Sequence, residues 1–245
     1  MGQWEEWSPW TGNMIADEMV QKLLMLSKVA KYAKGDIIYR EGLDNKLSLL
    51  LSGTVEISIT SASGRKRTIA IREARAFIDD VLVDGIYYAL TITCLTPVEI
   101  AICEHDVLAK AGYEDPSILD CMLRSLILKL QGLSFYLAGQ TFEEVEDRVY
   151  FLLVNLAKKY GIKTGNGYLI EKNLTHQFIA DIVGSTRVRV TQILKNLISE
   201  GLLDKIDGKF IVFRVEDCPK CEKTNLPNSS RYCGEEIIVE KKSED

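Results

Sequence analysis

The stretch THQFIADIVGSTRVRVTQILKNLIS, residues 175–199, constrains the fold of this 245-residue chain more than any other. Its second half carries apolar residues at i, i+3, i+4, i+7 and i+8, one stripe of an α-helix: Val190, Ile193, Leu194, Leu197 and Ile198. Gly184 lies where a tight turn between two helices needs a positive φ or close packing. Ser185 or Thr186 is placed to cap the second helix. The stretch therefore predicts a helix-turn-helix.

The opposite face of the second helix is polar and basic, with Arg187, Val188, Thr191, Gln192 and Lys195. Such a helix, with its apolar side buried, suits the major groove of DNA. Arginine pairs with guanine through two hydrogen bonds, glutamine reads adenine, and lysine contacts phosphate. An ordinary amphipathic surface helix has the same periodicity and is the alternative interpretation.

The net charge of −5 is unevenly divided along the chain. Residues 148–214 hold eleven Lys or Arg and five Asp or Glu, a net charge of +6, which leaves −11 for the remainder. A basic module joined to an acidic one is typical of a DNA-binding domain attached to a domain that meets another ligand. The content of 47% hydrophobic and 27% charged residues indicates a globular protein. No apolar run reaches the roughly 20 residues of a membrane span, and no signal peptide is recognised, so we expect a cytoplasmic location without a membrane partner.

Residues 30–109 have the sequence pattern of a β-rich domain. Glycine-containing turns recur about every ten residues, at Lys34-Gly35, Glu41-Gly42, Ser52-Gly53 and Ser63-Gly64. Strand-like runs lie between them at Leu47–Leu51, Val55–Thr60 and Arg67–Ile71. Short strands at regular spacing predict a β-barrel or jelly roll.

A long helix is predicted from about Pro116 to Gly139. Six leucines follow a 4-3-4-3-4 spacing, which is a heptad seam: Leu119, Leu123, Leu126, Leu130, Leu133 and Leu137. The seam predicts a homodimer in which this helix packs against its own copy. A helix elsewhere in the chain is the alternative partner, although no helix of matching length is apparent.

The remaining elements complete a winged helix. A helix is predicted over Glu143–Tyr160, followed by a glycine-rich turn over Gly161–Gly167. After the helix-turn-helix, Leu202–Phe213 predicts a hairpin whose turn is Asp207-Gly208, a dipeptide favoured in type I′ turns.

This order of elements resembles the CRP/FNR superfamily of bacterial transcription regulators over residues 25–215. The resemblance is carried by IADIVGSTRVRVTQILKNLISEGLL and the following wing, and by KGDIIYREG, LSLLLSGTVEIS, GRKRTIAI and AFIDDV. It implies an α+β protein with a jelly-roll-type β-roll that resembles cyclic-nucleotide-binding domains. The expected domains are a β-roll effector-sensing domain (1–115), a dimerisation helix (116–140), a winged-helix DNA-binding domain (141–216) and a cysteine-containing tail (217–245).

The resemblance places the three base-reading positions on Arg187, Val188 and Gln192. A family half-site resembles TGTNA, and dimer symmetry implies an inverted repeat. Val188 replaces a glutamate common in the family and offers only an apolar contact, while Gln192 replaces a frequent arginine. We expect phosphate contacts, which position the helix without specifying sequence, from Thr186, Arg189 and Lys195.

The resemblance also bears on the effector. Cyclic-nucleotide-binding relatives hold ribose and phosphate with a Gly-Glu pair and an Arg-Ser pair, and Asp79-Asp80 and Tyr87-Tyr88 stand at those places here. Two aspartates repel a phosphate, so cyclic AMP is not the expected ligand. The apolar, tyrosine-bearing segment instead favours a small hydrophobic or aromatic effector, as in regulators of organohalide respiration, which this chain resembles. The candidate pocket residues are Ile78, Asp80, Tyr87, Tyr88, Leu90 and Lys129.

Lys129 has two interpretations: a cation that neutralises a phenolate or carboxylate effector, or an exposed lysine. An iron–sulfur sensor of the FNR type is not expected, because the first cysteine is Cys94. Haem is not expected either, because His105 and His176 are the only histidines and neither is placed as a ligand. A redox pair among Cys94, Cys103 and Cys121 stays an alternative to buried thiols.

The tail resembles a zinc ribbon in which one ligand has changed. Its candidate ligands are Cys218, Cys221, Cys233 and Glu236, since zinc accepts thiolates and carboxylates. A three-cysteine iron–sulfur cluster, a degenerate ribbon, a ligand from elsewhere and a metal-free tail are the alternatives. No cofactor is assigned with certainty.

No acid/base pair, phosphate-binding glycine loop or nucleophile motif points to an enzyme. The hypothesis is a homodimeric, effector-responsive regulator that binds double-stranded DNA and works with RNA polymerase. A redox- or metal-responsive regulator is one alternative, and a signalling module that regulates a partner protein without DNA is another.

Overall fold

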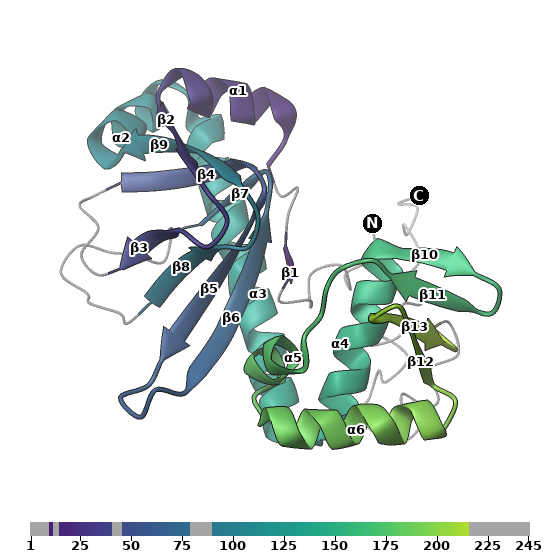
Figure 1. Cartoon of the computed structure of the whole chain (residues 1–245). Coiled ribbons are helices and arrows are strands. Elements are labelled where there is room, and N and C mark those ends of the chain that lie inside the picture. The colour runs from purple at the N-terminus through teal and green to yellow at the C-terminus, as the bar shows by residue number, and fades with distance from the viewer. Residues whose placement is uncertain (1–9, 12–14, 41–45, 79–89, 216–245) are drawn as a thin grey trace, which may run out of the picture. The chain divides into compact units, whose positions relative to one another are not determined.

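The computed structural model describes residues 10–11, 15–40, 46–78 and 90–215 (Figure 1). The chain divides into two compact units, one ending at Leu137 and the next beginning at Ala138. Within the described residues, no helix is long and apolar enough to cross a membrane. Several residues of the expected sites lie outside the described ranges: Asp80, Tyr87, Tyr88, Cys218, Cys221, Cys233 and Glu236.

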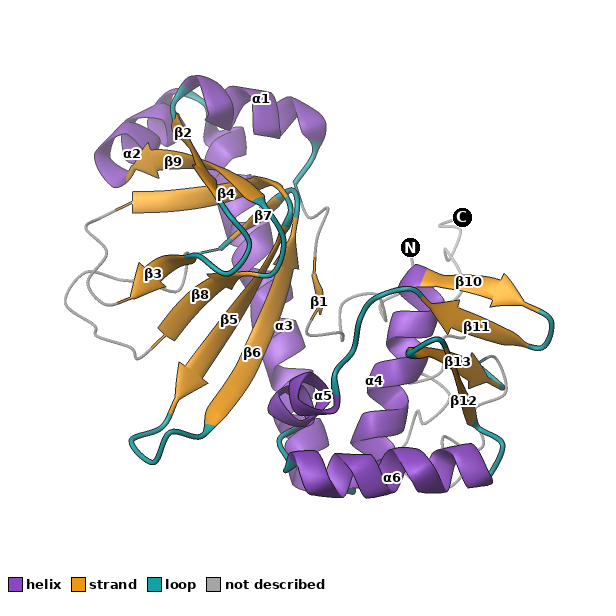
Figure 2. Cartoon of the chain, viewed as in Figure 1, coloured by secondary structure: helices purple, strands orange, loops and turns teal. Residues whose placement is uncertain are grey.

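Two sheets form the first unit (Figure 2). The five-stranded sheet has the order β1 (Trp10–Thr11), β6 (Lys66–Glu73), β5 (Thr54–Thr60), β8 (Leu90–Cys94) and β3 (Ile37–Arg40). The four-stranded sheet has the order β2 (Lys28–Tyr32), β9 (Val98–Glu104), β4 (Lys46–Ser52) and β7 (Ala76–Phe77). All the pairs are antiparallel except β1 with β6. The predicted β-roll is therefore confirmed.

The four-stranded sheet is covered on both faces, which explains the apolar run Leu49–Leu51 of β4. Leu50 joins a buried cluster with residues of the other sheet, among them Val55, Ile57 and Ile92. Leu47 and Leu49 instead belong to a second cluster with the helices α1 (Asp17–Met25), α2 (His105–Glu114) and the start of α3 (Pro116–Phe142). A strand buried on both faces has no polar alternation.

Gly53 shows why a glycine must end β4. Its φ is 87°, in the left-handed region, and an added Cβ would lie 2.2 Å from the carbonyl oxygen of Pro97. A side chain at this turn would therefore meet both backbone strain and a steric clash.

The helix α3 runs to Phe142, three residues past its predicted end at Gly139. One side packs on the β-roll through Ile118, Cys121 and Met122. The six leucines of the seam are between 40% and 65% exposed, so within the described residues no other element buries them. The apolar spacing is confirmed, but no element in the described part of the chain buries the leucine seam.

The second unit contains α4 (Val145–Tyr160), α5 (His176–Val183) and α6 (Arg187–Ser199), with a four-stranded sheet. The sheet has the order β10 (Gly161–Thr164), β11 (Gly167–Ile170), β13 (Lys209–Phe213) and β12 (Leu203–Ile206). The wing hairpin β12–β13 was predicted correctly, and its turn residues Asp207 and Gly208 have φ values of 50° and 81°. The prediction of a plain turn over Gly161–Gly167 was wrong, because β11 pairs with β13 and extends the wing sheet by two strands.

Candidate nucleic-acid interface

The turn between α5 and α6 is built by local capping. Gly184 ends α5 with φ 79° and ψ 47°, the left-handed conformation predicted from the sequence. The Thr175 hydroxyl accepts a hydrogen bond from the Phe178 N–H at 3.1 Å at the start of α5. The Thr186 hydroxyl accepts a hydrogen bond from the Arg189 N–H at 3.3 Å at the start of α6. Of the two predicted caps, Thr186 is therefore the one used.

Two side chains outside the motif hold this turn, Gln140 from the end of α3 and Arg148 from α4. Arg148 donates from Nε to the carbonyl oxygen of Val183 at 3.0 Å, and Gln140 donates from Nε2 to the same oxygen at 3.1 Å. The Arg148 guanidinium also donates to the Glu143 carbonyl at 2.7 Å. A cation at the C-terminal end of a helix satisfies carbonyls that lack intrahelical partners. Sequence reasoning missed both residues, because no local pattern links them to residue 183.

The two faces of α6 differ as predicted, with two exceptions, Ile198 and Thr191. Val190, Leu194 and Leu197 are buried against the rest of the unit. Ile198, predicted to belong to that stripe, is 38% exposed because it lies at the edge of the buried face. The expected base and phosphate contacts are all exposed: Thr186, Arg187, Val188, Arg189, Gln192 and Lys195. Val188 is 79% exposed, which is unusual for an apolar side chain in the middle of a polar face.

Thr191 faces α5 and joins the two helices. Its hydroxyl donates to the Arg187 carbonyl at 2.8 Å and lies 2.8 Å from Nδ1 of His176. Because a hydroxyl has one proton to donate, Nδ1 of His176 carries the proton of that second contact. The first residue of α5 thus supports the first turn of α6.

Acid is expected to weaken this helix pair. Burial lowers the pKa of His176, and the charges of Lys205 and Arg187 lower it further. The contribution of neutral His176 to folding is therefore complete above pH 6.5 and is lost as pH falls below that value. Denaturant unfolding between pH 7.5 and 5.5 should show stability falling more steeply with acid in the wild type than in His176→Asn, whose amide can donate in place of Nδ1. His105→Asn, which removes the other, exposed histidine, is the control, and equal slopes in all three proteins would contradict this role.

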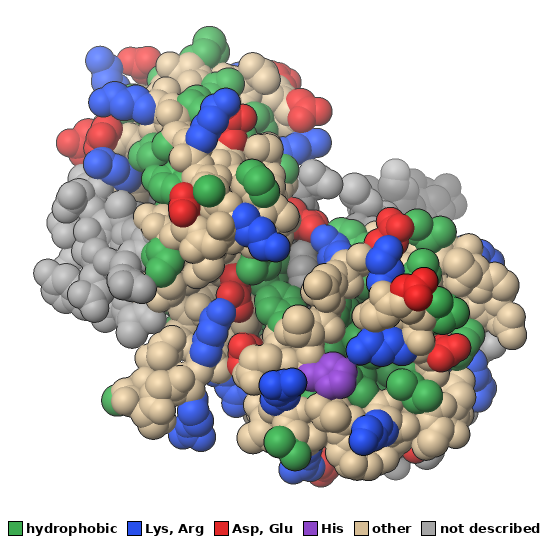
Figure 3. All heavy atoms as spheres, viewed as in Figure 1, with side chains coloured by type: hydrophobic (Ala, Val, Ile, Leu, Met, Phe, Trp, Pro, Cys, Tyr) green, Lys and Arg blue, Asp and Glu red, His purple; other side chains and the backbone are tan. Residues whose placement is uncertain are grey.

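The basic charge of this unit is distributed over the wing as well as α6. Lys205 lies 5.1 Å from the centre of the Phe210 ring, and Lys209 is 3.8 Å from a Glu171 carboxylate oxygen. Lysine and arginine side chains are spread across the visible face of the unit, with acidic side chains among them (Figure 3). Helix, wing and positive charge together form a surface able to meet a phosphate backbone.

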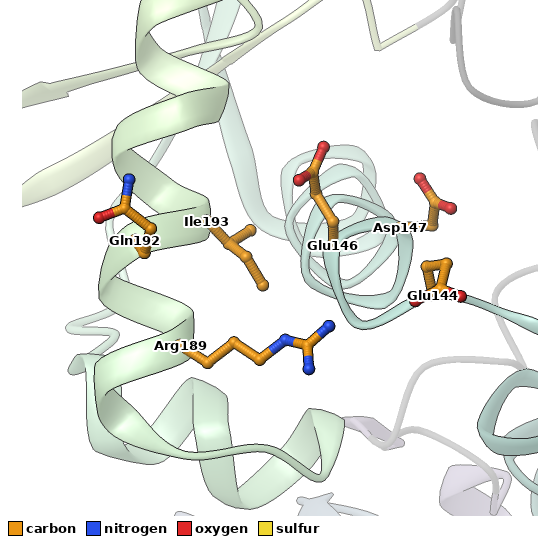
Figure 4. Close-up of a pocket in the computed structure, with 6 residues that line it drawn as sticks. All are labelled: Glu144, Glu146, Asp147, Arg189, Gln192 and Ile193. Carbon is orange, nitrogen blue, oxygen red and sulfur yellow. The ribbon is translucent and has the colours of Figure 1, made fainter.

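Arg189 lines a pocket together with acidic residues of the chain. It extends from α6 towards the first turn of α4, across a pocket of about 430 Å³ (Figure 4). The pocket is lined by Glu144, Glu146, Asp147, Arg189, Gln192 and Ile193.

The candidate effector residues that are described lie around the β-roll core. Ile78 and Leu90 belong to the buried cluster between the two sheets. The Lys129 ammonium donates to the Phe77 carbonyl at 2.9 Å and lies 5.8 Å from the centre of that ring. Lys129 is therefore partly buried and hydrogen-bonded, which corrects the interpretation of an exposed lysine.

The three cysteines of the β-roll and α3 are free thiols. Cys94 and Cys103 are buried and Cys121 is partly buried, and burial raises the pKa of all three. A raised thiol pKa lowers the fraction of thiolate. The cysteine is then less reactive, because the thiolate is the nucleophilic form. The described part of the chain contains no cluster of three or more His, Cys, Asp or Glu able to hold a metal ion.

Comparison with protein families matches both units. Residues 29–111 match the cyclic nucleotide-binding domain, and residues 147–218 match the Crp-like helix-turn-helix domain.

Known proteins are similar to most of the chain. A global nitrogen regulator of Synechocystis sp. is 30% identical over 172 residues, which cover 68% of this chain and 75% of that protein. The c-di-GMP-responsive global regulator CLP of Xanthomonas campestris has a similar fold, with a TM-score of 0.71, 19% identity and coverage of 81% of this chain and 99% of CLP. CprK, solved in complex with OCPA, matches with a TM-score of 0.70 and 18% identity over 86% of this chain and 98% of CprK.

Proposed function

The chain belongs to the CRP/FNR family of DNA-binding transcription regulators, and from that premise we propose that it acts as a homodimer on an inverted repeat, under the control of a small effector bound by its β-roll. The proposed sequence of events is effector binding, a shift of the two α3 helices, and a change in the spacing of the two α6 helices. The expected location is the cytoplasm, where DNA and RNA polymerase are available. The role is regulatory rather than catalytic.

One observation carries the DNA-binding mode: α6 buries Val190, Leu194 and Leu197 while exposing Arg187, Val188 and Gln192. In the major groove, Arg187 pairs with guanine, Gln192 with adenine, and Val188 contacts a thymine methyl group. We propose a half-site related to TGTNA, altered where Val188 and Gln192 replace other side chains. Thr186, Arg189 and Lys195 contact phosphates.

The proposed homodimer rests on the exposed leucine seam of α3. A heptad seam of leucines in water is stabilised by packing against a matching seam, and a second copy of α3 supplies one. The dimer places two copies of α6 about a two-fold axis, which gives the inverted repeat its symmetry.

The proposed effector is a small aromatic or apolar anion. Lys129 supports this choice, because its partly buried ammonium lies beside the ring and carbonyl of Phe77, the residue that precedes the candidate Ile78 in the chain. A phenolate or carboxylate would pair with that cation. The redox alternative is less favoured for Cys94, Cys103 and Cys121, since burial raises the pKa of each thiol.

Arg187→Ala tests the proposed base contact. We expect it to weaken binding of the selected duplex by about 1–3 kcal/mol and to relax discrimination at one guanine position. Lys195→Ala should weaken selected and random duplexes about equally and reduce the salt slope by about 1, because it removes a phosphate contact. Fluorescence anisotropy with both duplexes measures these effects, and equal loss on both duplexes for Arg187→Ala would refute base reading by Arg187.

The target duplex is obtained by selection from random DNA in reducing buffer. Enrichment of a two-fold-symmetric sequence supports the proposal and shows what Val188 and Gln192 specify. Repeating the selection with phenols and aromatic acids tests the effector class, since recovery of a site only in their presence identifies the ligand chemistry.

A further inference from the structure

Arg189 lies exposed at the start of the recognition helix and lines a pocket together with three acidic residues. Its side chain reaches towards the first turn of α4 (Figure 4). Glu144 precedes that helix, and Glu146 and Asp147 are in its first turn. With Gln192 and Ile193 of α6, these residues enclose the pocket of about 430 Å³.

The start of α4 concentrates negative charge within a few residues. Burial raises the pKa of neighbouring Glu143, and the charge of Asp147 raises it further, as expected where carboxylates crowd together. On α6, the helix beside this turn, every charged side chain is basic: Arg187, Arg189 and Lys195. The acidic turn is therefore an exception within the surface that would approach DNA phosphates.

We propose that the acidic first turn of α4 competes with DNA for Arg189. The negative charges of Glu146 and Asp147 attract the guanidinium across the pocket, and a DNA phosphate must outweigh that attraction. The turn is thus a positioning element that lowers DNA affinity by attracting one cation away from the DNA phosphates. This inference rests on the proposal that α6 enters the major groove.

A purely structural role for these carboxylates predicts the opposite sign. Acidic side chains in the first turn of a helix stabilise it through the helix dipole, so neutralising them should lower the melting temperature. If they only stabilised α4, their loss would weaken DNA binding or leave it unchanged. Competition for Arg189 instead predicts tighter binding by a slightly less stable protein.

The test is the full-length double variant Glu146→Gln/Asp147→Asn, measured by fluorescence anisotropy on selected and random duplexes. At low salt we expect about 3- to 10-fold tighter binding to both, since removing charges near a phosphate strengthens association. The salt slope should become steeper by about 1, because the released Arg189 adds a phosphate contact. In an Arg189→Gln background the gain should fall below about twofold, because the competed cation is absent.

The control variant Glu18→Gln/Asp106→Asn makes the same change in net charge on the β-roll, where both side chains are exposed. The inference is overturned if the α4 variant binds no more tightly than wild type, if the control gains as much, or if the gain persists in full with Arg189→Gln. Arg187→Ala separates the two proposals. If Arg187→Ala loses base discrimination while the α4 variant binds DNA no more tightly than wild type, the competition for Arg189 is rejected and the proposed DNA-binding mode stands.

Discussion

The double variant Leu123→Glu/Leu130→Glu is expected to be monomeric and to bind the selected inverted repeat at least about 100-fold more weakly than wild type. Both side chains are more than half exposed on α3, so the change removes little packing within one chain. In the proposed dimer, the four glutamates would face one another across the seam. Losing the second half-site contact removes the avidity that linked sites supply, about 10²- to 10⁴-fold. Sedimentation equilibrium gives the mass, and anisotropy gives the affinity.

Gln131→Glu/Ser134→Glu is the matched control for the seam. It adds the same charge to exposed positions of the same helix, outside the leucine spacing. It should stay dimeric and lose affinity only by the small electrostatic effect of added negative charge. A seam variant that remains a dimer, or that binds DNA as the control does, would exclude α3 as the dimer interface.

The second large effect is expected in the β-roll, where Glu56 is a buried carboxylate with a side chain only 3% exposed. Lys66 pairs with it at 2.5 Å, and the Thr68 hydroxyl donates to its other oxygen at 2.5 Å. Lys66→Met should lower the free energy of unfolding by about 2–4 kcal/mol, because it leaves a buried charge without its cation. This range lies below that of a fully buried pair, since the Lys66 side chain is 39% exposed. Urea denaturation measures the change.

Lys31→Met is the control for that variant, because Lys31 pairs with Glu99 at 3.1 Å but its side chain is 80% exposed. An exposed pair contributes about 0–1 kcal/mol. Adding Glu56→Gln to Lys66→Met should recover part of the lost stability, because the uncompensated charge is then absent. If Lys66→Met costs no more than Lys31→Met, the buried pair is not important for stability.

Local patterns predicted most of the fold, because each pattern is enforced within a few residues. The periodicity of α6, the glycine at its turn and the Thr186 cap act over one or two helical turns. The same is true of the Asp207-Gly208 turn of the wing. A hairpin turn or helix cap has the same stereochemistry in any protein, so such elements can be predicted from the sequence without a tertiary structure.

Contacts distant in the chain were the ones missed. The strands β10 and β11 pair with each other locally, but β11 is held in the wing sheet by β13, about 40 residues later, and the segment was predicted as a turn. Arg148 and Gln140 hold the Val183 carbonyl, yet neither belongs to the motif that it completes. Long-range hydrogen bonds leave no periodic signature in the sequence.

The sequence by itself determined the class of elements, the exposed chemistry of α6 and the leucine seam, since these depend on the order and spacing of side chains. Tertiary structure alone decided which polar groups meet. It brought His176 to Thr191, the Lys129 ammonium to the Phe77 carbonyl, and Arg189 towards the acidic turn of α4. The physical reason is that a charge or hydrogen-bond donor has no preferred sequence separation from its partner. Its partner is fixed only when packing of the apolar faces has placed the helices and strands.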